Sequence, residues 1–353
     1  MKKLNQIFLI LIGVSSSVFG QTRADSLLSA YHNKSGAVGI VAGYKSASET
    51  WSSSVGYKDL EAEQLFTNDT KTRTASISKL MTSVAIMQLV EAGKVDLEAS
   101  VGEYYSGASD LHSNITVRQL LNHSSGIRAY KSAKERGNKV EYEKMEDAYS
   151  IVKNDPLEND PGSAFYYSSY GYILLGIVIE EVSGLTYSKY LTQNVWKPLG
   201  MNNTGVERLG IEDNAFSQLY HKSSNGKVKK VKMRTNLSDR IPAGGVYSTV
   251  NDILLFGEGI LNEQLLSKAS FAEMTKDSGL KKEGNPYGLG LYLYGENPKS
   301  GNVVGHSGTQ MGASAQLMLL TDQNAVIFVA SNTSGVWEDM FFLNFSLFPE
   351  VTN

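Results

Sequence analysis

Residues 76–93 of the chain are Ser-Ile-Ser-Lys-Leu-Met-Thr-Ser-Val-Ala-Ile-Met-Gln-Leu-Val-Glu-Ala-Gly. Apolar side chains fall on nearly every side of a helix formed by this run, which predicts a buried helix over 76–92 that ends at Gly93. Lys79 is the exception. Its amine either extends to solvent or is held inside for chemistry, and on these residues alone extension to solvent is the expectation. Burial and the positive end of the helix dipole both lower the pKa of such an amine.

Ser76 and Lys79 stand three residues apart, a spacing that places both side chains on one face of a helix. The same Ser-x-x-Lys spacing also occurs at Ser150–Lys153, Ser224–Lys227 and Ser278–Lys281. Those three pairs lie in turn-like stretches or directly before Asn154-Asp155-Pro156, which predicts solvated surface pairs. The buried helix context therefore singles out Ser76 and Lys79 as the candidate nucleophile and its activating amine.

Strand patterns occupy the two ends of the chain, and helical patterns occupy its middle. Apolar or alternating runs predict strands at 37–44, 50–57, 303–306, 313–320 and 325–330, with a hairpin between the first two. Helical patterns are found at 76–92, 116–122, 170–182, 186–195 and 249–259, and 336–348 is expected to be a helix on the sheet. This order predicts an α+β fold: an antiparallel sheet built from both chain ends, flanked by helices, with an inserted, mainly helical lobe. The expected sheet lobe spans about 21–95 and 241–353, and the helical lobe about 96–240.

The first twenty residues have the composition of a secretory signal peptide. Lys2 and Lys3 precede an aliphatic run at 7–12, and small residues follow as far as Gly20. The alternative is a membrane anchor, but this run is far shorter than the roughly 20 residues that span a bilayer. We expect cleavage near Gly20, a mature domain over 21–353 without a stable membrane anchor, and a periplasmic or secreted location.

Composition excludes several other classes of protein. The 353-residue chain has no cysteine, which rules out disulfides, thiolate metal sites and a lipid-bearing cysteine. Its five histidines are far apart, so no metal and no cofactor are expected. A formal net charge of −3 gives no basic footprint for nucleic acid or for an anionic membrane surface. The oligomeric state is not determined by the sequence.

Five motifs resemble the class C β-lactamase and penicillin-binding-protein superfamily, in that family's order. The first is Thr-Ala-Ser-Ile-Ser-Lys at 74–79, followed by Gln-Leu-Val-Glu-Ala-Gly-Lys-Val-Asp-Leu at 88–97. The others are Leu-Leu-Asn-His-Ser-Ser-Gly-Ile at 120–127, Pro-Gly through Tyr-Ser-Ser to Leu-Gly at 161–176, Pro-Ala-Gly-Gly-Val-Tyr-Ser at 242–248, and Gly-His-Ser-Gly at 305–308. Together they span nearly all of the predicted mature chain.

The resemblance implies a role for each matching residue. Ser76 is then the nucleophile, Lys79 its activating partner and Tyr167 the second proton-transfer group. The backbone N–H groups of Ser76 and Thr309 would form the oxyanion hole. His123 is expected to order a loop rather than to catalyse.

Two departures from the family pattern bear on the substrate. Ser169 stands where the family usually has Asn, and a hydroxyl on a shorter side chain reaches less far and offers fewer hydrogen-bonding groups. His306, followed two residues later by Gly308, stands where β-lactamases have the Lys of Lys-Thr-Gly. Histidine is mostly neutral above a pKa near 6.5, so it offers no permanent charge to a substrate carboxylate. The His-x-Gly form resembles the family's esterases and D-peptidases.

Three functions remain open from the sequence. The first is an exported serine hydrolase that forms an acyl-serine intermediate from esters or D-amino-acid peptides. The second is a β-lactamase that hydrolyses β-lactam antibiotics, and the third is a non-catalytic binding protein that keeps the fold. In each case the expected partner is a small molecule or peptide with an acyl carbonyl.

Overall fold

The computed structural model describes residues 23–137, 139–211, 213–280, 286–297 and 301–352 of the chain. The predicted signal peptide at 1–20 lies outside these ranges. Within the described ranges, no helix is both long and apolar enough to cross a bilayer.

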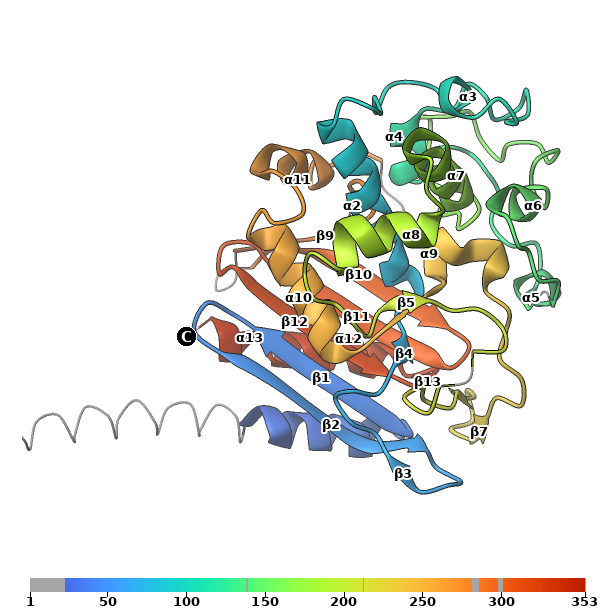
Figure 1. Cartoon of the computed structure of the whole chain (residues 1–353). Helices are drawn as coiled ribbons and strands as arrows, with labels where there is room; N and C mark the ends of the chain where they lie inside the picture. Colours follow the sequence, from blue (N-terminus) through green and yellow to red (C-terminus); the bar gives the residue numbers. More distant parts are fainter. Residues whose placement is uncertain (1–22, 138, 212, 281–285, 298–300, 353) are drawn as a thin grey trace, which may run out of the picture.

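A seven-stranded sheet, ordered β3-β2-β1-β12-β11-β10-β9, forms the centre of the molecule. Its strands are β1 (Gly39–Lys45), β2 (Thr50–Asp59), β3 (Gln64–Leu65), β9 (Tyr292–Asn297), β10 (Gly301–Gln310), β11 (Ala313–Leu320) and β12 (Ala325–Ser331). All neighbouring strands are antiparallel. Because β1 pairs with β12, the two ends of the chain meet in the middle of the sheet, which confirms the predicted α+β fold (Figure 1).

Most helices lie between the N-terminal and C-terminal strands along the chain. They are α2 (Ser78–Glu91), α3 (Val101–Tyr104), α4 (Val117–Leu121), α5 (Ala133–Arg136), α6 (Met145–Tyr149), α7 (Gly171–Ser183), α8 (Tyr187–Leu191), α9 (Ile241–Gly244), α10 (Val250–Leu261), α11 (Lys268–Met274), α12 (Trp337–Ser346) and α13 (Phe348–Val351). A further helix occupies 23–35, and short helical turns occupy Ala75–Ile77, Thr192–Trp196 and Ser238–Arg240.

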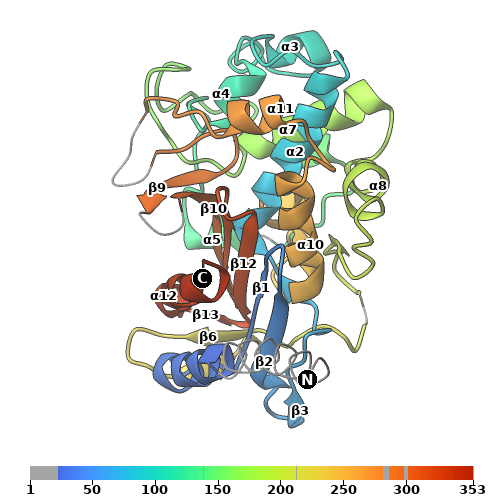
Figure 2. The same cartoon turned by 90° about the vertical axis from the view of Figure 1, so that its left-hand side faces the viewer.

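Helices cover both faces of the sheet, which explains why its central strands are buried along nearly their whole length. Alternate residues of β1 belong to different hydrophobic clusters: Ile40 and Ala42 to one, Val41 to the other. The first cluster packs under the helix 23–35 and α12, and the second packs under α2 and α10. Figure 2 shows α12 and α10 on opposite sides of the sheet.

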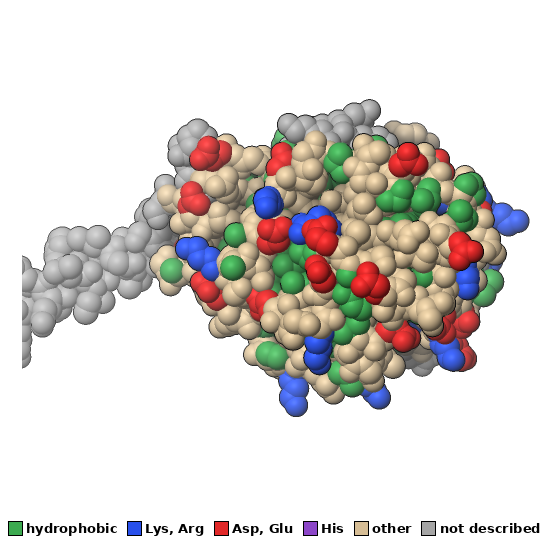
Figure 3. Space-filling model, turned by 90° about the horizontal axis from the view of Figure 1, so that it is seen from above, with side chains coloured by type: hydrophobic (Ala, Val, Ile, Leu, Met, Phe, Trp, Pro, Cys, Tyr) green, Lys and Arg blue, Asp and Glu red, His purple; other side chains and the backbone are tan. Residues whose placement is uncertain are grey.

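Two small three-stranded sheets connect the helical region to the large sheet. One is β4 (Thr72–Arg73), β8 (Val246–Ser248) and β5 (Gly205–Val206), and the other is β13 (Thr333–Ser334), β6 (Tyr220–Lys222) and β7 (Val228–Lys230). The first sheet fixes the chain that leads into α2, because β4 ends one residue before Thr74. Acidic and basic side chains are interspersed over the face that Figure 3 shows.

The predicted hairpin and long helices form, with boundaries that differ by a few residues. The strand expected at 303–306 is part of the longer β10, and β9, beside it at the sheet edge, was not predicted. The helix expected from residue 76 begins as a 3₁₀ turn, and its α-helical part starts at Ser78.

Candidate active site

Ser76 lies in the 3₁₀ turn at the start of α2, where the backbone is strained. Ala75 has φ +49°, a left-handed conformation that costs a non-glycine residue about 1–3 kcal/mol. The turn is held from both sides. Thr74 Oγ1 donates to Val246 O at 2.8 Å, and Ser78 Oγ donates to Ala75 O at 2.7 Å. Ser76 is therefore a partly exposed residue among buried neighbours.

Lys79 does not extend to solvent: it is 0% exposed, so the arrangement expected from the helix alone is wrong. The Lys79 amine lies 3.4 Å from Ser76 Oγ and 3.3 Å from Ser169 Oγ, and donates to Ala243 O at 2.9 Å. In the described residues no carboxylate forms an ion pair with Lys79. Burial, and to a lesser degree the charge of Arg240, lowers the pKa of Lys79 well below its usual range. The amine can therefore be neutral near Ser76 and accept a proton.

Tyr167 approaches the same pair from the segment that precedes α7. Its ring centre lies 4.7 Å from Lys79 Nζ. Burial raises the pKa of the Tyr167 hydroxyl well above its usual range, and the neighbouring Ser76 hydroxyl partly offsets this rise. Tyr167 is accordingly protonated at neutral pH.

His123 supports Tyr167, in agreement with the loop-ordering role expected for it. The two ring centres lie 4.1 Å apart, and His123 Nδ1 accepts a hydrogen bond from Ser168 N at 3.3 Å. The backbone carbonyl of His123 also accepts from Tyr166 N at 2.7 Å. Burial lowers the pKa of His123 well below its usual value, so the ring is neutral.

Strand β10 brings the predicted oxyanion-hole residues to Ser76. A Cβ placed on Gly308 would lie 2.4 Å from Thr74 O and 3.2 Å from Ser76 N, so only glycine permits this approach. Thr309 follows on the same strand and lines the pocket in front of Ser76. The backbones that carry the two predicted oxyanion donors, Ser76 and Thr309, are thereby brought together.

His306 lines the pocket, but both of its ring nitrogens already have partners in the protein. Nδ1 lies 2.5 Å from Ser307 O, and Nε2 lies 3.0 Å from the Tyr287 hydroxyl. A carbonyl can only accept, so Nδ1 carries the proton and Nε2 accepts from Tyr287. Burial lowers the pKa of His306 to about 3, which keeps the ring neutral. His306 therefore presents no charge to a ligand.

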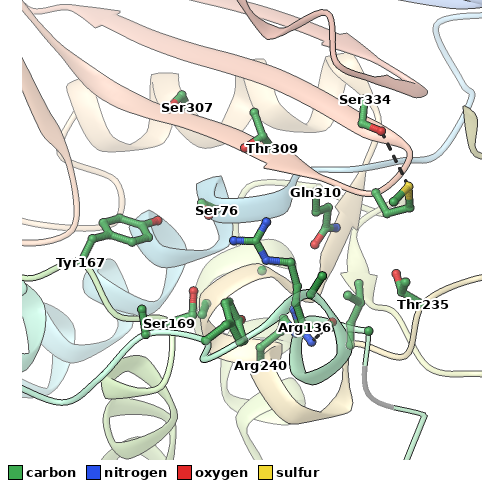
Figure 4. Close-up of a pocket in the computed structure, with 18 of the residues that line it drawn as sticks. Ser76, Arg136, Tyr167, Ser169, Thr235, Arg240, Ser307, Thr309, Gln310 and Ser334 are labelled. Atoms are coloured by element: carbon green, nitrogen blue, oxygen red, sulfur yellow. Dashed lines mark hydrogen bonds between the residues drawn. The ribbon is translucent and has the colours of Figure 1, made fainter. Parts of the chain in front are cut away.

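The residues converge on a pocket of about 720 Å³ (Figure 4). Five of the site residues predicted from the sequence line it: Ser76, Tyr167, Ser169, His306 and Thr309. The pocket also contains residues that the sequence analysis did not find: Tyr130, Arg136, Arg240, Tyr292 and Gln310. In the described part of the chain no group of histidines and carboxylates is arranged to hold a metal ion.

Of the other Ser-x-x-Lys pairs, the two that the structure describes in full, Ser150–Lys153 and Ser224–Lys227, have no comparable surroundings. Ser150, Ser224 and Lys227 are exposed, and the Ser150 hydroxyl donates to Asp147 O in its own turn. Lys281 lies outside the described residues. Burial of the lysine thus distinguishes Lys79 from Lys227.

The sheet flanked by helices and the serine paired with a buried lysine define a serine hydrolase. The chain belongs to the β-lactamase family: the family model described as Beta-lactamase matches residues 23–345.

Two curated relatives are each 28% identical to this chain. Penicillin-binding protein 4* of Bacillus subtilis aligns over 298 residues, which are 79% of this chain and 64% of the relative. The human mitochondrial serine beta-lactamase-like protein LACTB aligns over 404 residues, covering 84% of this chain and 71% of the relative. The match thus spans about two thirds of each relative's length.

Solved structures share the fold over nearly the whole chain. A D-stereospecific amidohydrolase from Streptomyces sp. has a TM-score of 0.75 at 27% identity, covering 92% of this chain and 98% of its own. A penicillin-binding protein homologue from Pyrococcus abyssi has a TM-score of 0.81 at 24% identity, covering 92% of this chain and 76% of its own.

Proposed function

We propose that this protein hydrolyses esters or D-amino-acid peptides through an acyl-serine intermediate on Ser76. The observation that carries the proposal is the Lys79 amine, fully buried, 3.4 Å from Ser76 Oγ and without a carboxylate partner among the described residues. An amine kept neutral in this way is a general base within reach of the hydroxyl that it must deprotonate.

In the proposed reaction Lys79 takes the Ser76 proton while Ser76 Oγ attacks the acyl carbonyl carbon. The negative charge that develops on the carbonyl oxygen is stabilised by the N–H groups of Ser76 and Thr309. Tyr167, protonated and adjacent to Ser76, donates a proton to the leaving alcohol or amine as the bond to the acyl carbon breaks. A water molecule then attacks the acyl-serine, and its proton passes back through the same groups.

The neutral state of His306 favours this substrate class over β-lactams. A permanent positive charge at this position would attract the carboxylate of a β-lactam, whereas the His306 ring is neutral and both of its nitrogens are occupied. The name of the Streptomyces relative, a D-stereospecific amidohydrolase, supports the D-amino-acid alternative. We further propose that residues 1–20 direct export and that the mature domain acts in the periplasm or outside the cell.

A panel of substrates tests the proposal. Wild-type protein is offered p-nitrophenyl esters, D-alanyl peptides and nitrocefin, with Ser76→Ala as the reference. We expect turnover of an ester or a D-peptide that Ser76→Ala lowers by at least about 10³-fold. Rapid turnover of nitrocefin alone would assign the β-lactamase function instead. If no member of the panel is turned over in a Ser76-dependent way, the result supports a non-catalytic protein.

A further inference from the structure

The wall of the pocket formed by α5 carries an arginine with an unusual set of contacts. Arg136 lines the pocket and, among the described residues, its guanidinium forms no ion pair. Figure 4 shows the Arg136 side chain extending into the pocket toward Ser76.

The other arginines near this pocket are paired with carboxylates. Arg73 binds Glu207 at 2.6 Å, and Arg240 binds Asp239 through two hydrogen bonds of 2.7 and 2.8 Å. Arg128, on the same segment as Arg136, contacts both Asp155 and Glu135. Each of these guanidinium groups has five N–H donors. Among the four arginines, Arg136 alone forms no ion pair with a described residue and keeps its donors for a ligand.

Arg136 is an exposed residue whose guanidinium contacts one aromatic ring and whose backbone contacts Arg240. Its guanidinium lies 5.3 Å from the centre of the Tyr130 ring, and the Arg240 guanidinium lies 4.6 Å from the same ring. Arg240 also donates to the backbone carbonyl of Arg136. Such contacts reduce the freedom that a flexible side chain loses when it binds an anion.

The remaining lining of the pocket suits an anion and not a cation. Two arginines, Arg136 and Arg240, line the pocket. None of the described residues that line it is Asp or Glu. The opposite wall, strand β10, contributes Gln310, whose buried Nε2 has no hydrogen-bond partner and can donate to a ligand. An ammonium group, as in a substrate with a free amino end, would meet the charge of Arg136 and, among the described lining residues, no carboxylate.

We propose that Arg136 is a specificity-determining residue that binds a carboxylate of the acyl donor, so that this enzyme prefers anionic substrates. This inference rests on the proposed acyl transfer at Ser76. It specifies, in addition, the charge of the preferred substrate. Guanidinium and carboxylate match in a bidentate geometry, which gives orientation as well as affinity. This positive charge lies on the α5 wall of the pocket and not at the His306 position on β10, where β-lactamases have a lysine.

Two matched substrate pairs test the proposal. p-Nitrophenyl hydrogen glutarate is compared with its methyl ester, and N-acetyl-D-alanyl-D-alanine is compared with its C-terminal amide. The variants are Arg136→Gln and, as control, Lys134→Gln, an exposed residue of α5 that does not line the pocket. We expect the wild type to prefer the carboxylate member of at least one pair. Arg136→Gln should lower kcat/KM for that member about 10- to 100-fold, the usual effect of losing a charged hydrogen bond.

Turnover of the neutral members separates the two proposals. Arg136→Gln should leave kcat/KM for the neutral members within about twofold of the wild-type value. Lys134→Gln should not change kcat/KM for either member of a pair. A wild type that prefers the neutral members, or an Arg136→Gln variant that loses both members equally, overturns the role of Arg136 while acyl transfer stands.

Ligand binding tests the carboxylate subsite independently of catalysis. Calorimetry on Ser76→Ala, with N-acetyl-D-alanyl-D-alanine and its amide as ligands, should show tighter binding of the carboxylate form, which is lost when Arg136→Gln is added. Equal binding of the two ligands would contradict the carboxylate subsite even if no substrate in the panel is hydrolysed.

Discussion

Lys79 has a buried amine whose three hydrogen-bond contacts are all with uncharged oxygen atoms. A charged ammonium in such surroundings is costly, because nothing nearby repays the loss of its hydration. The residue therefore favours its neutral form, and the positive charge of Arg240 acts in the same direction. At the scale of single residues, the proposed chemistry at Ser76 depends on this amine.

Replacement of Lys79 by Met should increase stability at neutral pH while it lowers turnover by about 10²- to 10⁴-fold. Because the pKa of Lys79 is depressed in the folded state, the unfolded state binds more protons between that pKa and the usual lysine value of 10.5. Wild-type stability therefore rises with pH in this window. The advantage of Lys79→Met should be larger at pH 7 than at pH 10 when both proteins are unfolded with urea. An advantage that stays constant with pH would show that the amine is charged in the folded protein.

At the scale of elements, the contact between β10 and the turn before α2 creates the site. Gly308 allows the two backbones to approach, and the strained Ala75 presents Ser76 toward the pocket. Neither segment would hold this geometry alone, since the turn also depends on hydrogen bonds to Val246 in β8.

Gly308→Ala should disrupt this contact, because the added Cβ would lie 2.4 Å from a backbone oxygen. We expect a loss of about 1–3 kcal/mol in the free energy of unfolding, the usual cost of overpacking. The kcat should fall by at least about 10²-fold, because the oxyanion donors separate. The matched control is Gly171→Ala in α7, where the nearest atom lies at 3.5 Å and little change is expected. Wild-type kcat in Gly308→Ala would refute the role given to this contact.

The sequence predicted those elements that have a strong periodicity. The helix over 76–92, the hairpin at 37–57 and the strands 313–320 and 325–330 could be recognised because one period holds over many residues. The strand β9 has no comparable pattern: its residues are Tyr-Leu-Tyr-Gly-Glu-Asn, and it borders a segment outside the described residues. The 3₁₀ turn at Ser76 arises from contacts with β8 and β10, which local sequence does not encode.

At the scale of the whole molecule, the candidate site combines segments from five distant parts of the chain. Ser76 and Lys79, Tyr167, Ala243 and the β10 residues could be anticipated because motifs mark them. Tyr130 and Arg136 could not, because the sequence around them has neither helical nor strand periodicity. Their importance comes from long-range contacts with Ser169 and Arg240.

Buried histidines make the stability of the whole fold depend on pH. His112 contacts the Tyr149 hydroxyl at 2.8 Å, and burial lowers its pKa from 6.5 to about 4. The unfolded state then binds more protons than the folded state between these two values, so stability falls as pH drops through this window. His306 and His123 act in the same direction, since burial lowers the pKa of both.

His112→Asn should remove one part of this acid sensitivity. Between about pH 6.5 and 4, the wild type should lose up to about 1.4 kcal/mol per pH unit relative to the variant. Urea unfolding of both proteins at pH 7.5, 6, 5 and 4.5 measures the difference. A difference that does not change with pH would mean that His112 is not buried in its neutral form.

Labelling with a fluorophosphonate, followed by mass spectrometry of the digested protein, tests the central claim most directly. The proposed role of Ser76 predicts one adduct, on the peptide that contains Ser76, formed at neutral pH. It also predicts no adduct in Ser76→Ala, labelling at least about 10²-fold slower in Lys79→Met, and unchanged labelling in Ser150→Ala. Equal labelling of Ser76→Ala, or labelling of Lys79→Met at the wild-type rate, would contradict it.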